Sequence, residues 1–184
     1  MAAIPDDEAK AIIEEYSHLG PQSGTLQVFG NRFLLLRPET LVVIQKQLEE
    51  TVGASTKGII YLAGERSFME GHVLVKELLE GFDLSSLGPE VLKRMADILA
   101  LLGWGRFTYV SLDFEALRFV LALEHSPIAE SYGPTKKPAC HFLAGWLAGA
   151  ARSLLGRELL CEETACAAQG RPRCEFQLKL MPVA

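Results

Sequence analysis

The 184-residue sequence lacks the features that direct a chain out of the cell or into a membrane. The apolar stretch 139–155 is shorter than the roughly 20 apolar residues that span a bilayer, and Arg152 interrupts it. The first 16 residues show no positively charged segment ahead of an apolar one, which a secretory signal would need. We therefore expect a cytoplasmic protein with no membrane span.

Positive charge is scarce and scattered along the chain. Lysine and arginine number 18 against 23 acidic residues, which gives a formal net charge of −5. A surface that binds nucleic acid needs a basic stripe, and this sequence has none, so we expect no direct contact with nucleic acid. Hydrophobic residues make up 49% of the chain, and this surplus predicts either an internal pocket or a subunit interface.

Turn residues and apolar periodicity predict an α+β fold, in which a mostly antiparallel sheet packs with helices. We expect an N-terminal helical extension over 1–24, with its helix at 6–18, followed by one domain over 25–184. Strands are predicted at 26–29, 32–37, 107–112, 116–124, 158–164 and 174–180. Helices are predicted at 38–52, 55–80, 89–102 and 139–155, and loops at 126–138 and 166–173.

Four cysteines in a reducing compartment indicate metal or redox chemistry before disulfides. Cys166 and Cys174 flank a turn-rich loop, and Glu163 precedes Cys166 by three residues, at the end of a strand. Cys140 lies at the start of a predicted helix, where the helix dipole favours a thiolate. Three thiolates and one carboxylate form a closed set of four ligands, which is typical of structural zinc.

Spacing alone leaves alternatives open. Cys161 lies two residues from Glu163 on the same strand and shares its face, so it could replace Glu163 and give an all-cysteine site. The cysteines could also be inert core residues, because free cysteine is among the most buried residue types. Iron is a further alternative at a site rich in thiolates.

The C-terminal segment 138–180 resembles a known family. It begins Pro-Ala-Cys, continues with a glycine-bearing helix, and ends with Glu-x-x-Cys, seven residues and a last Cys. This pattern is similar to the 4-vinyl reductase domain, which bacterial sensors of aromatic compounds share with a protein of bacteriochlorophyll synthesis. The resemblance implies zinc held by Cys140, Glu163, Cys166 and Cys174, and it favours Glu163 over Cys161.

A weaker resemblance extends upstream, so that it covers about 25–180. It implies a ligand-binding domain whose fold also occurs in NO-signalling domains and Golgi-transport subunits, with the zinc site at 138–180. Aromatic-responsive members carry a Trp where this sequence has Leu123, and the helix that could supply their polar His offers Met95. These two departures argue against phenol as the ligand.

The resemblance places a ligand pocket between the sheet and the helices. Its predicted lining is aromatic and apolar, with one histidine as a polar anchor: Tyr61, Phe68, His72, Phe107, Tyr109, Phe119, Leu123 and Trp146. Aromatic residues at such spacing are also common in an ordinary core.

We expect a zinc-stabilised binding or sensor domain for a small hydrophobic molecule, which acts as a regulatory module and forms a homodimer. We expect no enzymatic activity, because the sequence shows no phosphate loop and a closed zinc site has no position for activated water. The alternatives are an accessory or carrier protein in tetrapyrrole vinyl reduction and a dimeric scaffold without a ligand.

Overall fold

The computed structural model describes residues 10–11, 14–15, 17–20, 22–28, 30–78 and 89–181, apart from the side chains of residues 19, 71–78 and 89–90. Its helices are α2 (Pro38–Val52), α3 (Thr56–Leu78), α4 (Pro89–Leu101), α5 (Pro127–Tyr132) and α6 (His141–Leu155), with short 3-10 turns η1 (Gly53–Ser55) and η2 (Ala167–Gln169). Its strands are β1 (Ser17–Gly20), β2 (Thr25–Val28), β3 (Asn31–Phe33), β4 (Arg106–Asp113), β5 (Arg118–Glu124), β6 (Leu159–Ala165) and β7 (Cys174–Leu180).

The strands form two sheets, and every strand pair in them is antiparallel. One sheet has the order β1-β2-β3 and the other the order β4-β5-β7-β6. The prediction of an α+β fold with antiparallel sheets is therefore confirmed.

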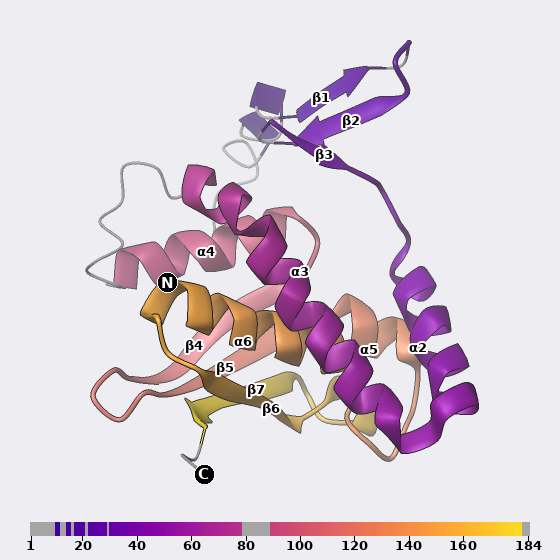
Figure 1. Ribbon diagram of the computed structural model, residues 1–184, viewed down its shortest axis with the longest axis vertical. Coiled ribbons are helices and arrows are strands. Elements are labelled where there is room, and N and C mark those ends of the chain that lie inside the picture. Colours follow the sequence, from indigo (N-terminus) through magenta and orange to yellow (C-terminus); the bar gives the residue numbers. More distant parts are fainter. Residues whose placement is uncertain are drawn as a thin grey trace.

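The N-terminal part differs from the prediction. Residues 17–20 form β1, which pairs with β2, so the predicted helix 6–18 ends before Ser17. A tight turn closes this pair, because the N–H and the hydroxyl of Ser23 both donate to the Gly20 carbonyl. The predicted boundary after residue 24 thus falls inside the three-stranded sheet. Figure 1 shows this sheet at the opposite end of the molecule from β6 and β7, with residues 34–37 extended between it and α2.

A short helix replaces the start of the predicted loop 126–138. Ser126 caps α5, because its hydroxyl accepts a hydrogen bond from the Ala129 N–H, and Pro127 occupies the first helical position. Both residue types favour a helix start. Three prolines and a glycine in this segment had suggested a loop throughout.

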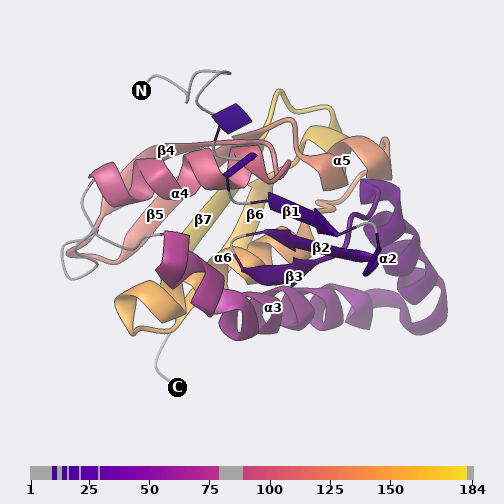
Figure 2. The ribbon, with the colours of Figure 1, turned by 90° about the horizontal axis from the view of Figure 1, so that it is seen from above.

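Helix α6 lies between α3 and the four-stranded sheet (Figure 1). A methyl group on Gly145 of α6 would collide with the Tyr61 carbonyl of α3, and one on Gly64 would collide with the Phe142 carbonyl. The absence of side chains at these glycines therefore lets the two helix backbones approach closely. Helix α4 lies along β4 (Figure 2). Among the described helices, none combines the length and the apolar character needed to cross a membrane.

Candidate metal centre and apolar cavity

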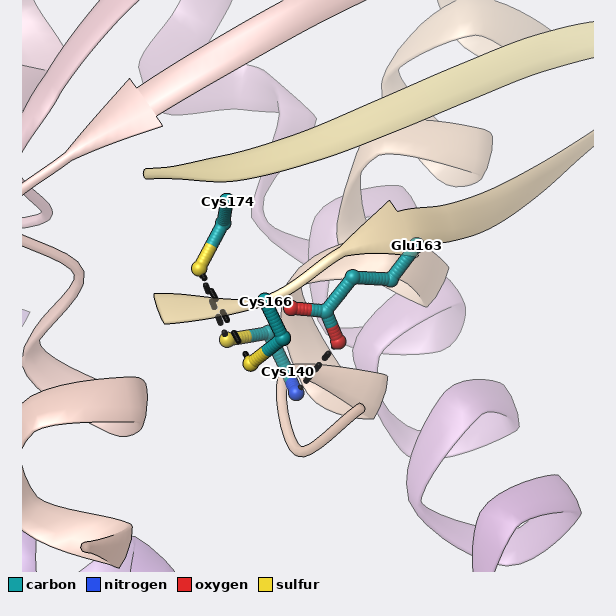
Figure 3. A group of neighbouring side chains, drawn as sticks. All are labelled: Cys140, Glu163, Cys166 and Cys174. Atoms are coloured by element: carbon teal, nitrogen blue, oxygen red, sulfur yellow. Dashed lines mark hydrogen bonds between the residues drawn. The ribbon is translucent and has the colours of Figure 1, made fainter. Parts of the chain in front are cut away.

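Three structural elements bring the predicted metal ligands to one place. Cys140 directly precedes α6, Glu163 lies near the end of β6, Cys166 follows that strand, and Cys174 begins β7. Figure 3 shows the three sulfur atoms and the carboxylate pointing toward one another. Their ligand atoms all lie within 4.8 Å of one another. The three cysteines are 0% exposed and Glu163 is 8% exposed.

The spacing of the sulfur atoms suits a tetrahedral ion. The Sγ atoms of Cys140 and Cys174 are 3.8 Å apart, and those of Cys174 and Cys166 are 4.0 Å apart. With zinc–sulfur bonds of about 2.3 Å, tetrahedral geometry places the sulfurs about 3.8 Å apart. The cluster therefore needs little rearrangement to bind a metal ion of this kind.

Glu163 carries an oxygen without a partner. Its Oε2 accepts a hydrogen bond from the Cys140 N–H at 2.8 Å, whereas its buried Oε1 has no hydrogen-bond partner in the described part of the chain. Burial, with a smaller contribution from Cys166, raises the pKa of Glu163 to about 8. A metal ion would satisfy Oε1 and keep the carboxylate ionised, so the donor set fits a bound cation.

The sulfur atoms share protons and hydrogen bonds. Hydrogen bonds from Cys140 and Cys174 lower the pKa of Cys166, and the bonds with Cys166 and Cys174 raise the pKa of Cys140. The Ser126 hydroxyl lies 3.3 Å from Cys140 Sγ, and the Ala167 N–H donates to Cys174 Sγ at 3.3 Å. Contacts of this kind orient metal ligands and favour thiolates.

An apolar cavity of about 80 Å³ lies farther along α6. Helices α4 and α6 and strands β4, β5 and β7 supply its lining: Leu92, Met95, Leu99, Phe107, Tyr109, Leu112, Phe114, Phe119, Leu121, Trp146, Leu147, Ala150, Ala151, Leu154, Leu155 and Leu178. The Tyr109 hydroxyl donates to the Leu92 carbonyl at 2.9 Å, and burial raises the pKa of Tyr109. Phe114 is 42% exposed, so the lining reaches the surface at the β4–β5 turn.

The cluster and the cavity both lie on elements of one recognisable sequence segment. Residues 119–180 match the family model of the vinyl-4-reductase domain. The predicted resemblance to the 4-vinyl reductase domain family is confirmed by this match, which contains all four cluster residues. No curated protein matches the chain closely enough to count as a relative.

Solved structures show how widely the fold of this chain recurs. The phenol-responsive sensory domain of the transcription activator PoxR, solved with phenol, is 20% identical at a TM-score of 0.76, over 98% of this chain and 92% of that one. An H-NOX protein from S. oneidensis in its Fe(II)NO state is 13% identical at 0.52, over 94% and 87%. A trafficking protein particle complex subunit 3 from Naegleria fowleri, covalently bound to palmitic acid, is 14% identical at 0.51, over 78% and 95%. The predicted kinship of fold is therefore confirmed.

The alternative metal ligand lies outside the cluster. Cys161 faces the same side of β6 as Glu163, as the sequence predicted, and is 3% exposed. It is absent from the cluster found among the described residues. Its backbone N–H donates a hydrogen bond to the Tyr61 hydroxyl of α3 at 3.1 Å. The geometry therefore groups Glu163, and not Cys161, with the other three cysteines.

Half of the predicted pocket residues line the cavity, namely Phe107, Tyr109, Phe119 and Trp146. Three others lie elsewhere. Tyr61 bonds to β6, Phe68 packs edge-on against Trp146 at a ring separation of 4.7 Å without reaching the cavity, and Leu123 pairs with Cys174 beside the metal cluster. The side chain of His72 lies outside the described residues. Assignment of these residues to ligand binding stays a prediction.

Sequence reasoning missed the helical share of the lining. Leu92, Met95 and Leu99 recur at helical spacing along α4, as do Trp146, Ala150 and Leu154 along α6. This periodicity was visible in the sequence. It could not show which neighbour the two apolar faces meet.

A second groove, of about 870 Å³, runs beside the metal cluster and was not predicted. It lies between the end of α2, the start of α3, the end of α5, the start of α6 and β6. Unlike the cavity, it is lined by many polar and charged side chains, and Glu163 lies at its edge.

Proposed function

We propose that this protein is a zinc-stabilised domain that binds a small hydrophobic molecule and acts as a sensor or regulatory module. The single observation that carries the proposal is the apolar cavity between α4, α6 and the four-stranded sheet. A pocket lined almost wholly by apolar and aromatic side chains is typical of a site for an apolar ligand. Two proteins that share the fold have a small apolar group in their described states, phenol in one and palmitic acid in the other.

The size of the cavity favours a compact ligand. An engineered cavity of about 150 Å³ in another protein takes up benzene, and the cavity here is about half as large. A single aromatic ring would enter with small shifts of adaptable side chains such as Met95. A tetrapyrrole is far larger, so the cavity does not favour a role in vinyl reduction.

Thermal unfolding in the presence of toluene tests this proposal. We expect toluene at millimolar concentration to raise the melting temperature, because a ligand that binds only the folded state stabilises it. Ala150→Leu, which fills the cavity, should abolish that increase. Val110→Leu, on the outer face of β4 and 51% exposed, is the matched control and should retain it. An unchanged melting temperature in the unsubstituted protein would contradict the proposal.

We further propose that the metal is zinc and that its role is structural. Four protein ligands leave zinc no open position for a water molecule, and on that basis we propose that the protein is not an enzyme. Native mass spectrometry of protein purified without added metal should show one zinc per chain. Removal of zinc by a strong chelator should be accompanied by loss of cooperative unfolding. Metal-free protein that unfolds cooperatively would refute the proposal.

We also propose a homodimer, which works in the cytoplasm, where thiols stay reduced. Leu34 and Leu35, in the extended segment before α2, are 75% and 81% exposed, and Val43 and Ile44 of α2 are also exposed. Large neighbouring apolar side chains of this kind mark an interaction surface. Sedimentation equilibrium should give a dimer, and Leu35→Ser should shift it toward monomer. Val110→Ser, an equally conservative loss of an exposed apolar group elsewhere, should leave the dimer intact.

A further inference from the structure

The groove beside the metal cluster contains side chains that neither proposed role uses. Thr56, the first residue of α3, lines it and is 2% exposed, yet its Oγ1 has no hydrogen-bond partner among the described residues. A buried hydroxyl without a partner costs about 1–3 kcal/mol of stability. Such a group is usually satisfied by something that binds there.

The charges that line the groove are unevenly paired. Both carboxylate oxygens of Glu49 are occupied, one by the Tyr132 hydroxyl at 2.6 Å and the other by Gln45 at 3.0 Å. Glu162 lies 3.6 Å from Lys179, and Glu163 belongs to the metal cluster. The acidic side chains therefore already have partners.

The basic side chains of the groove do not. Lys57 and Lys137 both line it, and within the described part of the chain neither ammonium group makes a hydrogen bond or an ion pair. Helix α6 also begins at the groove with His141 and has no side-chain cap. The N-terminal end of a helix of this length carries a partial positive charge that attracts anions.

The groove also offers apolar surface. Tyr61, Tyr132, Pro138, Ala144 and Leu160 lie among its lining residues. Its volume of about 870 Å³ lies within the range of about 300–1,000 Å³ that is typical of small-molecule sites. It has room for a ring as well as for a charged group.

We propose that this groove is a second binding site, for a small organic anion whose oxyanion group contacts Lys57, Lys137 and the Thr56 hydroxyl while its apolar body lies against the tyrosines. The site is separate from the apolar cavity, and its occupation does not depend on a ligand there.

Calorimetric titration with benzoate and benzamide tests the site, because these molecules have nearly the same shape and differ in charge. We expect benzoate to bind at least about tenfold more tightly, since bonds to a charged acceptor are about twice as strong as neutral ones. Lys57→Gln with Lys137→Gln should remove this preference. Lys136→Gln, in the same loop but not lining the groove, is the matched control and should retain it. Equal affinity for the two molecules, or no benzoate binding at millimolar concentration, would overturn the proposal.

A second variant separates a binding role of Thr56 from a structural one. Thr56→Val keeps the shape of the side chain and removes the hydroxyl that lacks a partner. We expect the unliganded variant to melt at a higher temperature and to bind benzoate about fivefold more weakly. A lower melting temperature with unchanged benzoate affinity would overturn the assignment. Benzoate affinity should be unchanged in Ala150→Leu, and zinc content should stay constant throughout; loss of benzoate binding in Ala150→Leu would instead place the ligand in the apolar cavity.

Discussion

Helix α6 begins at a cluster of polar ligands and continues beside an apolar cavity, and the two regions are held together by different interactions. At the cluster, directed contacts fix each group: Glu163 accepts from the Cys140 N–H, and Cys174 accepts from the Ala167 N–H. Around the cavity, close apolar contacts dominate and space is left over. A directed site tolerates little change in its atoms, whereas a cavity lined by flexible apolar groups can accommodate change.

The largest expected effect comes from breaking the directed region. Cys166→Ser should lose the metal and lower the free energy of unfolding by at least about 3 kcal/mol, because metal binding is coupled to folding. Metal content and urea unfolding, each measured with and without chelator, check this. Cys161→Ala removes a buried thiol outside the cluster, and it should keep one metal per chain and cost about 1 kcal/mol. Equal metal loss in both variants would contradict the grouping of ligands.

A smaller effect is expected where α3 and α6 join the two regions. Gly145→Ala places a methyl group against the Tyr61 carbonyl, and it should cost about 1–3 kcal/mol because neither backbone can move freely. Gly58→Ala, in α3, meets no atom within 4 Å and should raise stability by up to about 1 kcal/mol. Urea unfolding of the pair measures the difference. Similar stabilities would mean that the two helices are less tightly packed than the structure indicates.

The smallest effect sharpens the comparison within the directed region. Tyr61→Phe removes the hydroxyl that accepts from the Cys161 N–H, a single neutral hydrogen bond worth about 1 kcal/mol. Thermal unfolding should show that modest loss, with metal content unchanged. A loss as large as that of Cys166→Ser would show that this hydroxyl supports the metal cluster itself.

Much of the fold could be predicted where its signals are local. Pro38 at a helix start, the turn at Gly30-Asn31 and the strand 174–180 were all readable from neighbouring residues. The ligand cluster was also predictable, because three of its members lie close together in sequence and the fourth begins a helix. The resemblance to a family then selected Glu163 over Cys161.

The parts that sequence could not supply depend on distant contacts. Leu123 and Phe119 share one face of β5, yet one lies beside the metal cluster and the other lines the cavity, because α6 covers different contents along its length. Tyr61 and Phe68 lie on α3, which α6 separates from the sheet. Periodicity assigns a residue to a face, and it does not identify what that face meets.

The hairpin β6–β7 has a consequence for the order in which the fold is completed. It supplies Glu163, Cys166 and Cys174, and the two cysteines are separated by only eight positions. Cys140 stands 34 positions from Cys174, so it joins the others only when a much longer segment has closed. The entropy lost in closing a loop grows with its length. The hairpin can therefore gather three ligands early, and arrival of the fourth marks the moment at which α6 docks on the sheet.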